Sequence, residues 1–177
     1  FFFFLYGYGV FTTLAIYNAK PFLWEKHLQR LTENASRLGI DLAEFSEDSV
    51  HQSLMQLIAE NSVINGRARL TFFDESAKGF WQTKSKNKIS LLITTADMRQ
   101  VEPINLTVSP YRINSTSPLA NIKSCNYLEN LLAIDEAKKR NFNEAVRLNE
   151  KGEITSAIMA NFFWCKDGQV FTPSLKT

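Results

Sequence analysis

Residues 118–130 have the sequence PLANIKSCNYLEN, in which Lys123 lies between an irregular stretch and a helix. The preceding residues 111–120 are rich in Ser, Thr and Asn and show no hydrophobic periodicity. After Lys123, leucines recur at helical spacing up to the basic residues 138–140, which suit the negative end of a helix dipole. A lysine at such a boundary can serve as an active amine, but its position alone does not establish that role.

The rest of the chain predicts helices and strands in mixed order. Apolar residues at helical spacing predict a helix over residues 25–38, and Ser46 resembles the N-cap of a second helix with acidic residues in its first turn. Runs of apolar and β-branched residues predict strands at 10–17, 67–73, 89–95, 104–109, 144–148, 154–158, 162–165 and 170–172. Residues 74–88 are expected to form a polar loop, and residues 149–152 and 166–168 to form glycine-containing turns.

These elements predict an α+β fold in two lobes. We expect an N-terminal lobe over residues 1–110, an interdomain linker over 111–122 and the start of a C-terminal lobe over 123–177. The chain starts with Phe1 rather than Met and stops just after a turn, so we expect a fragment whose second lobe is incomplete.

Composition narrows the classes of function. The formal net charge of +2 is too small for the basic field that attracts nucleic acid, so no nucleic-acid partner is expected. The longest apolar stretch, residues 1–11, is too short to span a bilayer. Cys125 and Cys165 lack metal-ligand spacing, which predicts no metal site and reduced thiols in a cytoplasmic protein.

Common catalytic motifs are missing from the sequence. His27 and His51 both lie on predicted helices, where histidine more often has a surface or packing role. The sequence contains no nucleophile elbow, zinc-protease, Walker or dinucleotide-binding pattern. Residue types alone therefore leave the reaction open.

Three ordered blocks of sequence carry a resemblance to a known family. They are YGYGVF with EKHLQRL at 6–11 and 25–31, the segment 118–130, and NEKGEIT with ANFFW at 149–155 and 160–164. Together they resemble the class IV aminotransferases, the fold-type IV pyridoxal-phosphate enzymes that include branched-chain and D-amino-acid aminotransferases and aminodeoxychorismate lyase. The resemblance implies a homodimer that binds pyridoxal 5′-phosphate and acts on an amino acid or amino-substituted carboxylate.

The resemblance also implies roles for single residues. Lys123 would form the internal aldimine with the cofactor and carry the proton during the reaction, because a lysine amine lowers its pKa readily on burial. Arg30 would bind the cofactor phosphate, since a guanidinium can hold two of its oxygens. Tyr127 would face the phenolic oxygen of the cofactor, or else serve in packing.

Three further residues match substrate positions of the family. Tyr6 and Phe11 would line the substrate pocket, with an aromatic core beneath the first strand as the alternative. Arg69 would meet a substrate carboxylate, although alternation on its strand does not say which face it occupies.

Ser156 stands where the family has a glutamate beside the pyridine nitrogen. A carboxylate keeps that nitrogen protonated, whereas a hydroxyl can share only a hydrogen bond, so the ring should be a weaker electron sink. Glu153 lies three residues earlier and is expected to face the other way. The function expected by default is amino transfer. The alternatives are aminodeoxychorismate lyase, which releases pyruvate and 4-aminobenzoate by β-elimination, and a non-catalytic member of the family.

Overall fold

The computed structural model of the protein describes residues 3, 6–76, 88–98 and 102–174. The chain forms two compact units, Phe1–Gln100 with Ile122–Asn126, and Val101–Asn121 with Tyr127–Thr177. These divisions differ from the expected lobe boundaries. Strand pairing explains the difference. The backbone of Lys123 is hydrogen-bonded to Phe11 in the first unit, and the strand at residues 106–108 pairs with residues 144–146 in the second unit.

The first unit is built on an antiparallel sheet of four strands in the order β2-β1-β3-β4. The predicted strands of this lobe are confirmed with small differences at their ends, and the lysine-proline strand β2 is additional. The strands are β1 (Gly9–Tyr17), β2 (Lys20–Pro21), β3 (Gly66–Asp74) and β4 (Ile89–Asp97). Of the polar loop expected at residues 74–88, residues 77–87 lie outside the described part of the chain.

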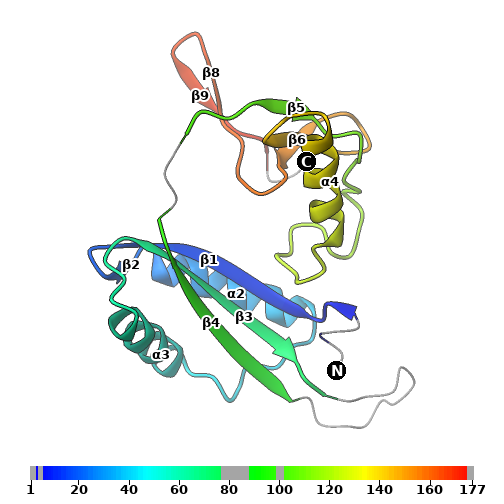
Figure 1. The fold of residues 1–177 in the computed structure, drawn as a ribbon. Coiled ribbons are helices and arrows are strands. Elements are labelled where there is room, and N and C mark those ends of the chain that lie inside the picture. The colour runs from blue at the N-terminus through cyan, green and yellow to red at the C-terminus, as the bar shows by residue number, and fades with distance from the viewer. Residues whose placement is uncertain (1–2, 4–5, 77–87, 99–101, 175–177) are drawn as a thin grey trace. The chain divides into compact units, whose positions relative to one another are not determined.

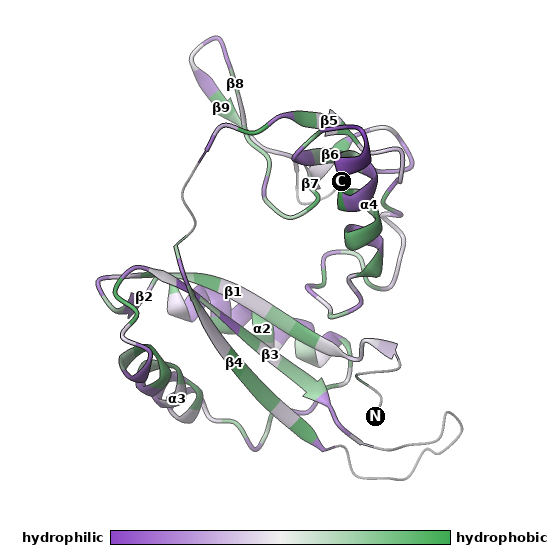
Figure 2. Ribbon diagram, viewed as in Figure 1, coloured by the Kyte–Doolittle hydropathy of each residue, from purple (hydrophilic) through white to green (hydrophobic). Residues whose placement is uncertain are grey.

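Two helices of this unit, α2 (Trp24–Arg37) and α3 (Glu47–Glu60), lie against the same side of the sheet (Figure 1). Alternate residues of the central strands point into a common core with the apolar stripes of both helices. This core contains Val10, Leu14, Ile16, Leu31, Ala35, Val50, Leu54, Ile58, Leu70 and Phe72. In Figure 2, β1 and β3 each carry hydrophobic and more polar segments. One face of the sheet is therefore covered by the two helices and forms the hydrophobic core.

The second unit contains a three-stranded sheet in the order β5-β6-β7, where β5 (Leu106–Val108) runs parallel to β6 (Glu144–Leu148) and β7 (Ile154–Ala157) is antiparallel to it. Helix α4 (Leu128–Lys139) packs on this sheet through Ala133 and Ala137. A hairpin of β8 (Trp164–Lys166) and β9 (Gln169–Phe171) follows.

Local features of the second unit refine the sequence-based expectations. The predicted turns are present, with φ of 84° at Gly152 and 73° at Gly168, the left-handed region that glycine accepts without strain. Residues 111–121 of the expected linker are part of this unit, and Ile122 belongs to the first unit. Ile113 forms a parallel bridge to Asn149, and the Ser115 hydroxyl donates to Glu150 at 2.6 Å. Within the described residues, no helix has the length and hydropathy needed to cross a membrane.

The N-cap of α3 gives a stability prediction. The Ser46 hydroxyl accepts a hydrogen bond from the Ser49 N–H at 3.2 Å, as its sequence position predicts. Ser46→Ala should lower the free energy of unfolding by about 1 kcal/mol, because it leaves a helix N–H without its side-chain acceptor. Chemical denaturation followed by circular dichroism measures this loss.

Ser53→Ala is the matched control, since the Ser53 hydroxyl lies inside the same helix and donates to the Ser49 carbonyl. Equal stability of the Ser46 variant and the wild type would contradict the capping account.

Candidate active site around Lys123

Lys123 is attached to the edge of the first sheet through its backbone. The Phe11 N–H donates to the Lys123 carbonyl at 2.9 Å, and the Cys125 N–H donates to the Gly9 carbonyl at 2.8 Å. Between these bonds Val10 and Ser124 form an antiparallel bridge. A Cβ at Gly9 would lie 2.8 Å from the Phe72 carbonyl oxygen and 3.2 Å from the Cys125 sulfur, so the close approach requires glycine. The short segment thus acts as an extra edge strand.

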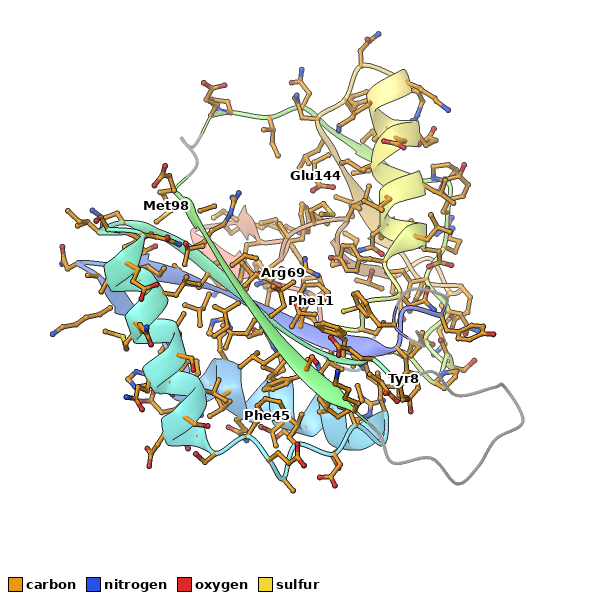
Figure 3. The ribbon with its side chains drawn as sticks, turned by 60° about the horizontal axis from the view of Figure 1, so that its bottom comes forward. Tyr8, Phe11, Phe45, Arg69, Met98 and Glu144 are labelled. Atoms are coloured by element: carbon orange, nitrogen blue, oxygen red, sulfur yellow. The ribbon has the colours of Figure 1, made fainter. Side chains whose placement is uncertain are left out.

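The side chain of Lys123 shares the sheet face that the helices leave open. Lys123 Nζ lies 5.2 Å from the centroid of the Phe11 ring, and the guanidinium carbon of Arg69 lies 3.7 Å from the same centroid. Figure 3 shows Phe11 and Arg69 together on the sheet. Because Thr13 pairs with Arg69 and Phe11 with Thr71, all four belong to one face. The register thus settles the face of Arg69, which alternation alone left open.

Electrostatics around Lys123 favour the neutral amine. The side chain is half-buried, and burial lowers the pKa of the Lys123 amine, with further lowering from the charges of Arg30 and then Arg69. A lysine with a lowered pKa has more of its amine unprotonated at neutral pH, which is the form that acts as nucleophile and base. The surroundings of Lys123 therefore suit amine chemistry.

Arg30 lies on the side of α2 that faces β1. Its Nη2 donates to the hydroxyl of the buried Thr12 at 2.7 Å, and that hydroxyl lies 2.8 Å from Nδ1 of His27. Arg30 Nη2 and His27 Nδ1 are themselves 3.3 Å apart. Burial lowers the pKa of the His27 imidazole, and the charges of Arg30 and Lys123 lower it further. A buried threonine thus links two polar residues of the helix.

Thr12 and His27 were not predicted as site residues. A histidine on a helix usually has a packing role, so the position of His27 does not indicate a site. A threonine within an apolar strand, such as Thr12, is explained by its preference for strands. The available signal was the spacing of His27 and Arg30, which three residues apart share one face of a helix.

The remaining predicted site residues do not all join this cluster. Tyr6 belongs to the first unit and is 46% exposed. Tyr127 stands at the N-cap position of α4, and Ser156 lies on β7 opposite the buried Arg147, so both belong to the second unit. Glu153 precedes β7 and accepts a hydrogen bond from the Asn149 side chain at 2.7 Å, which commits its carboxylate elsewhere.

Metal-ligand side chains do not gather in the part of the chain that the structure describes. No group of three or more His, Cys, Asp or Glu residues there has an arrangement that could hold a metal ion. The chemical groups of the described cluster are an amine, two guanidinium groups, an imidazole and a hydroxyl.

Comparison with known proteins identifies the family. Residues 9–177 match the family described as amino-transferase class IV, and the chain belongs to it. It is 32% identical to the aminodeoxychorismate lyase of Bacillus subtilis (strain 168), covering 98% of this chain and 61% of that protein. It is 27% identical to a probable branched-chain-amino-acid aminotransferase of Rickettsia typhi, covering 95% of this chain and 59% of that protein.

Solved structures share the fold. A putative 4-amino-4-deoxychorismate lyase from Legionella pneumophila superimposes with a TM-score of 0.86 at 24% identity, covering 98% of this chain and 65% of that one. The branched-chain amino acid aminotransferase of Escherichia coli gives 0.84 at 25% identity, covering 96% and 60%. The fold is therefore the α+β architecture of fold-type IV enzymes, and the chain spans less than two thirds of the length of these relatives.

The two cysteines should differ in reactivity. Burial raises the pKa of the Cys125 thiol to about 11, against a smaller opposing effect of Arg69, whereas Cys165 is exposed. The thiolate is the nucleophile, so Cys125 should stay unreactive at neutral pH and gain reactivity only as the pH approaches its raised pKa. Iodoacetamide labelling at pH 7 and pH 10, followed by mass spectrometry of each peptide, measures the rates. Labelling of Cys125 at pH 7 as fast as that of Cys165 would contradict this burial.

Proposed function

We propose that this chain is part of an enzyme that uses pyridoxal 5′-phosphate to transform an amino acid or amino-substituted carboxylate, with Lys123 as the amine that holds the cofactor. The observation that carries the proposal is the state of Lys123. Its amine lies half-buried above Phe11, and burial and the charges of two arginines lower its pKa. Family membership agrees with this chemistry.

The residues of the first unit fit an aldehyde that carries a phosphate. An unprotonated amine captures an aldehyde, and a guanidinium binds a phosphate through paired N–H groups. In the described residues Arg30 makes its contacts through Nη2, which leaves Nε and Nη1 available for a ligand. The charge of Arg30 also lowers the pKa of the Lys123 amine, which supports a role for both groups towards one small molecule.

Each residue has a distinct task in this proposal. When bound, the cofactor supplies an aldehyde carbon and an electron-withdrawing ring. Lys123 attaches through Nζ and, once released, moves a proton at the same atom. Arg30 holds the phosphate. Phe11 would give the amine an apolar wall that excludes water. Arg69, whose guanidinium carbon lies 3.7 Å from the centroid of that ring, would meet a substrate carboxylate.

The other predicted site residues enter as parts of the same proposal. Tyr6 would contribute to the substrate pocket, Tyr127 would meet the phenolic oxygen of the cofactor, and Ser156 would meet its pyridine nitrogen. The whole enzyme would be a homodimer, as the family resemblance implies, and cytoplasmic, as the spacing of its two cysteines predicts.

Amino transfer is the proposed reaction, in keeping with the aminotransferases among the relatives. A second candidate is the lyase reaction, because Ser156 supplies no carboxylate to protonate the pyridine nitrogen and a weaker electron sink favours elimination. The similarity to the lyases of Bacillus subtilis and Legionella pneumophila supports this candidate too.

Replacing the amine tests the central role. Lys123→Met removes the nucleophile and keeps an unbranched apolar side chain, so the complete protein should lose the imine absorption band that pyridoxal 5′-phosphate gives to the wild type. Borohydride reduction followed by peptide mapping should label Lys123 in the wild type. Lys166→Met on the exposed β8 is the control and should keep the band. A wild-type protein that gives neither band nor label would support the non-catalytic alternative.

The acceptor requirement separates the two reactions. Amino transfer needs an α-keto acid acceptor, whereas elimination releases pyruvate without one. Ser156→Glu supplies the missing carboxylate and should raise the ratio of transfer to elimination by about tenfold or more, the effect of one pKa unit or more at the ring nitrogen. Product analysis with and without acceptor measures that ratio. If Ser156→Glu left it unchanged, Ser156 would not control the ring nitrogen.

A further inference from the structure

Arg147 is a buried cation on β6. Its side chain is only 2% exposed, and each of its nitrogens donates a hydrogen bond of 3.3 to 3.4 Å. A charge that is removed from water needs polar partners, and the loss of one partner leaves the charge uncompensated. The segments that supply these partners are therefore held in place around the guanidinium.

The partners of Arg147 come from two separate segments of the second unit. Nε donates to the main-chain carbonyl of Tyr111, and Nη2 donates to that of Arg112. Nη1 donates to the side-chain oxygen of Asn130, and Nη2 also reaches the exposed carboxylate of Glu129. One guanidinium thus joins residues 111–112 to the first turn of α4.

The chain between these two segments, residues 113–128, carries Lys123, and we call it the Lys123 loop. At its start the Ile113 N–H donates to the Leu148 carbonyl of β6 at 2.9 Å. Just after its end, the Asn130 side chain donates to the Ile158 carbonyl at 2.8 Å. Residues 122–126 in its middle belong to the first unit. The loop therefore leaves the second unit and returns to it, with Arg147 bonded to the chain on both sides.

Fixing the ends of a loop limits the conformations that its middle can adopt. A loop with fixed ends loses less conformational entropy when its middle pairs with another segment. Here the middle pairs with β1 through the bonds from Phe11 to the Lys123 carbonyl and from Cys125 to the Gly9 carbonyl. These two bonds should open less often while Arg147 holds both ends of the loop.

We propose that Arg147 is a positioning residue, which keeps residues 123–125 on the edge of β1 by holding both ends of the Lys123 loop. The placement of the loop is argued from the hydrogen bonds of Arg147 and of residues 123–125. The benefit of this placement to the amine of Lys123 rests on the proposed function.

The thiol of Cys125 reports the opening of the loop. Burial raises its pKa to about 11 while the segment is paired, and an opened segment exposes the thiol to iodoacetamide. In the complete protein, mass spectrometry of each peptide gives the labelling rate of Cys125 relative to that of the exposed Cys165 in the same sample. This measurement needs no cofactor.

Three variants separate a hold on the loop from general loosening of the second unit. Arg147→Met removes every donor and keeps an unbranched side chain. Arg147→Lys keeps the charge but has one nitrogen, so it cannot bond to the two sides of the loop through separate nitrogens. Ala137→Gly is the matched control, because it weakens the core of the same unit within α4 and leaves the guanidinium in place. Circular dichroism checks that each variant is folded.

We expect Arg147→Met to speed the labelling of Cys125 by about tenfold or more, the effect of losing hydrogen bonds to a charged group. Arg147→Lys should also label faster than the wild type, and Ala137→Gly should label at the wild-type rate. An unchanged rate in Arg147→Met, or an equal increase in Ala137→Gly, would overturn the proposal. If Arg147→Met does not fold, Arg147→Lys decides by the same comparison.

The outcome is distinguishable from that of the proposed function. If labelling follows the expected pattern while pyridoxal 5′-phosphate forms no imine with the wild type, the proposed function fails and the positioning of the loop by Arg147 stands. If the imine forms on Lys123 but labelling of Cys125 does not depend on Arg147, the proposed function stands and the positioning role is rejected.

Discussion

The backbone pairing of residues 123–125 with the start of β1 is the constraint on which the candidate site depends. Two hydrogen bonds, from Phe11 to the Lys123 carbonyl and from Cys125 to the Gly9 carbonyl, join segments that are far apart in sequence. Alternation along this added edge sends Ser124 towards the packed face and Lys123 towards Phe11. A shift of one residue would exchange these faces and bury the wrong side chain.

The two faces of the sheet in the first unit have different roles. One face packs against α2 and α3 and supplies the hydrophobic core, while the other carries Phe11, Arg69 and the amine of Lys123. Thr12 is a polar exception on the packed face, where its hydroxyl bridges Arg30 and His27. A buried hydroxyl needs such hydrogen-bond partners, so Thr12 belongs both to the packed face and to the candidate site.

The sequence predicted the helices and strands better than it predicted which distant segments pair with each other. Periodicity located α2 and the strands, and Ser46 predicted the start of α3, because these signals act over a few neighbouring residues. Which unit receives Lys123 depends on pairing between distant segments, and the sequence placed that lysine in the other lobe.

The residues of the candidate site show the same contrast between what the sequence indicates and what depends on contacts between distant segments. Family resemblance predicts Lys123 and Arg30, and the structure adds the surroundings that give each a physical rationale. The sequence does not indicate Thr12 and His27, because their contact joins a strand and a helix. The face of Arg69 likewise needed the register of β1 and β3.

The pKa of the Lys123 amine is the quantity that tests this account most directly. Lysines labelled with ¹³C at Cε can be followed by NMR over a pH titration, and the Lys123→Met variant assigns the resonance. The account predicts a titration midpoint below the ordinary value for lysine, and a rise in that midpoint when Arg69→Met removes one of the nearby charges. A Lys123 that titrates at the ordinary value, with or without Arg69, would contradict it.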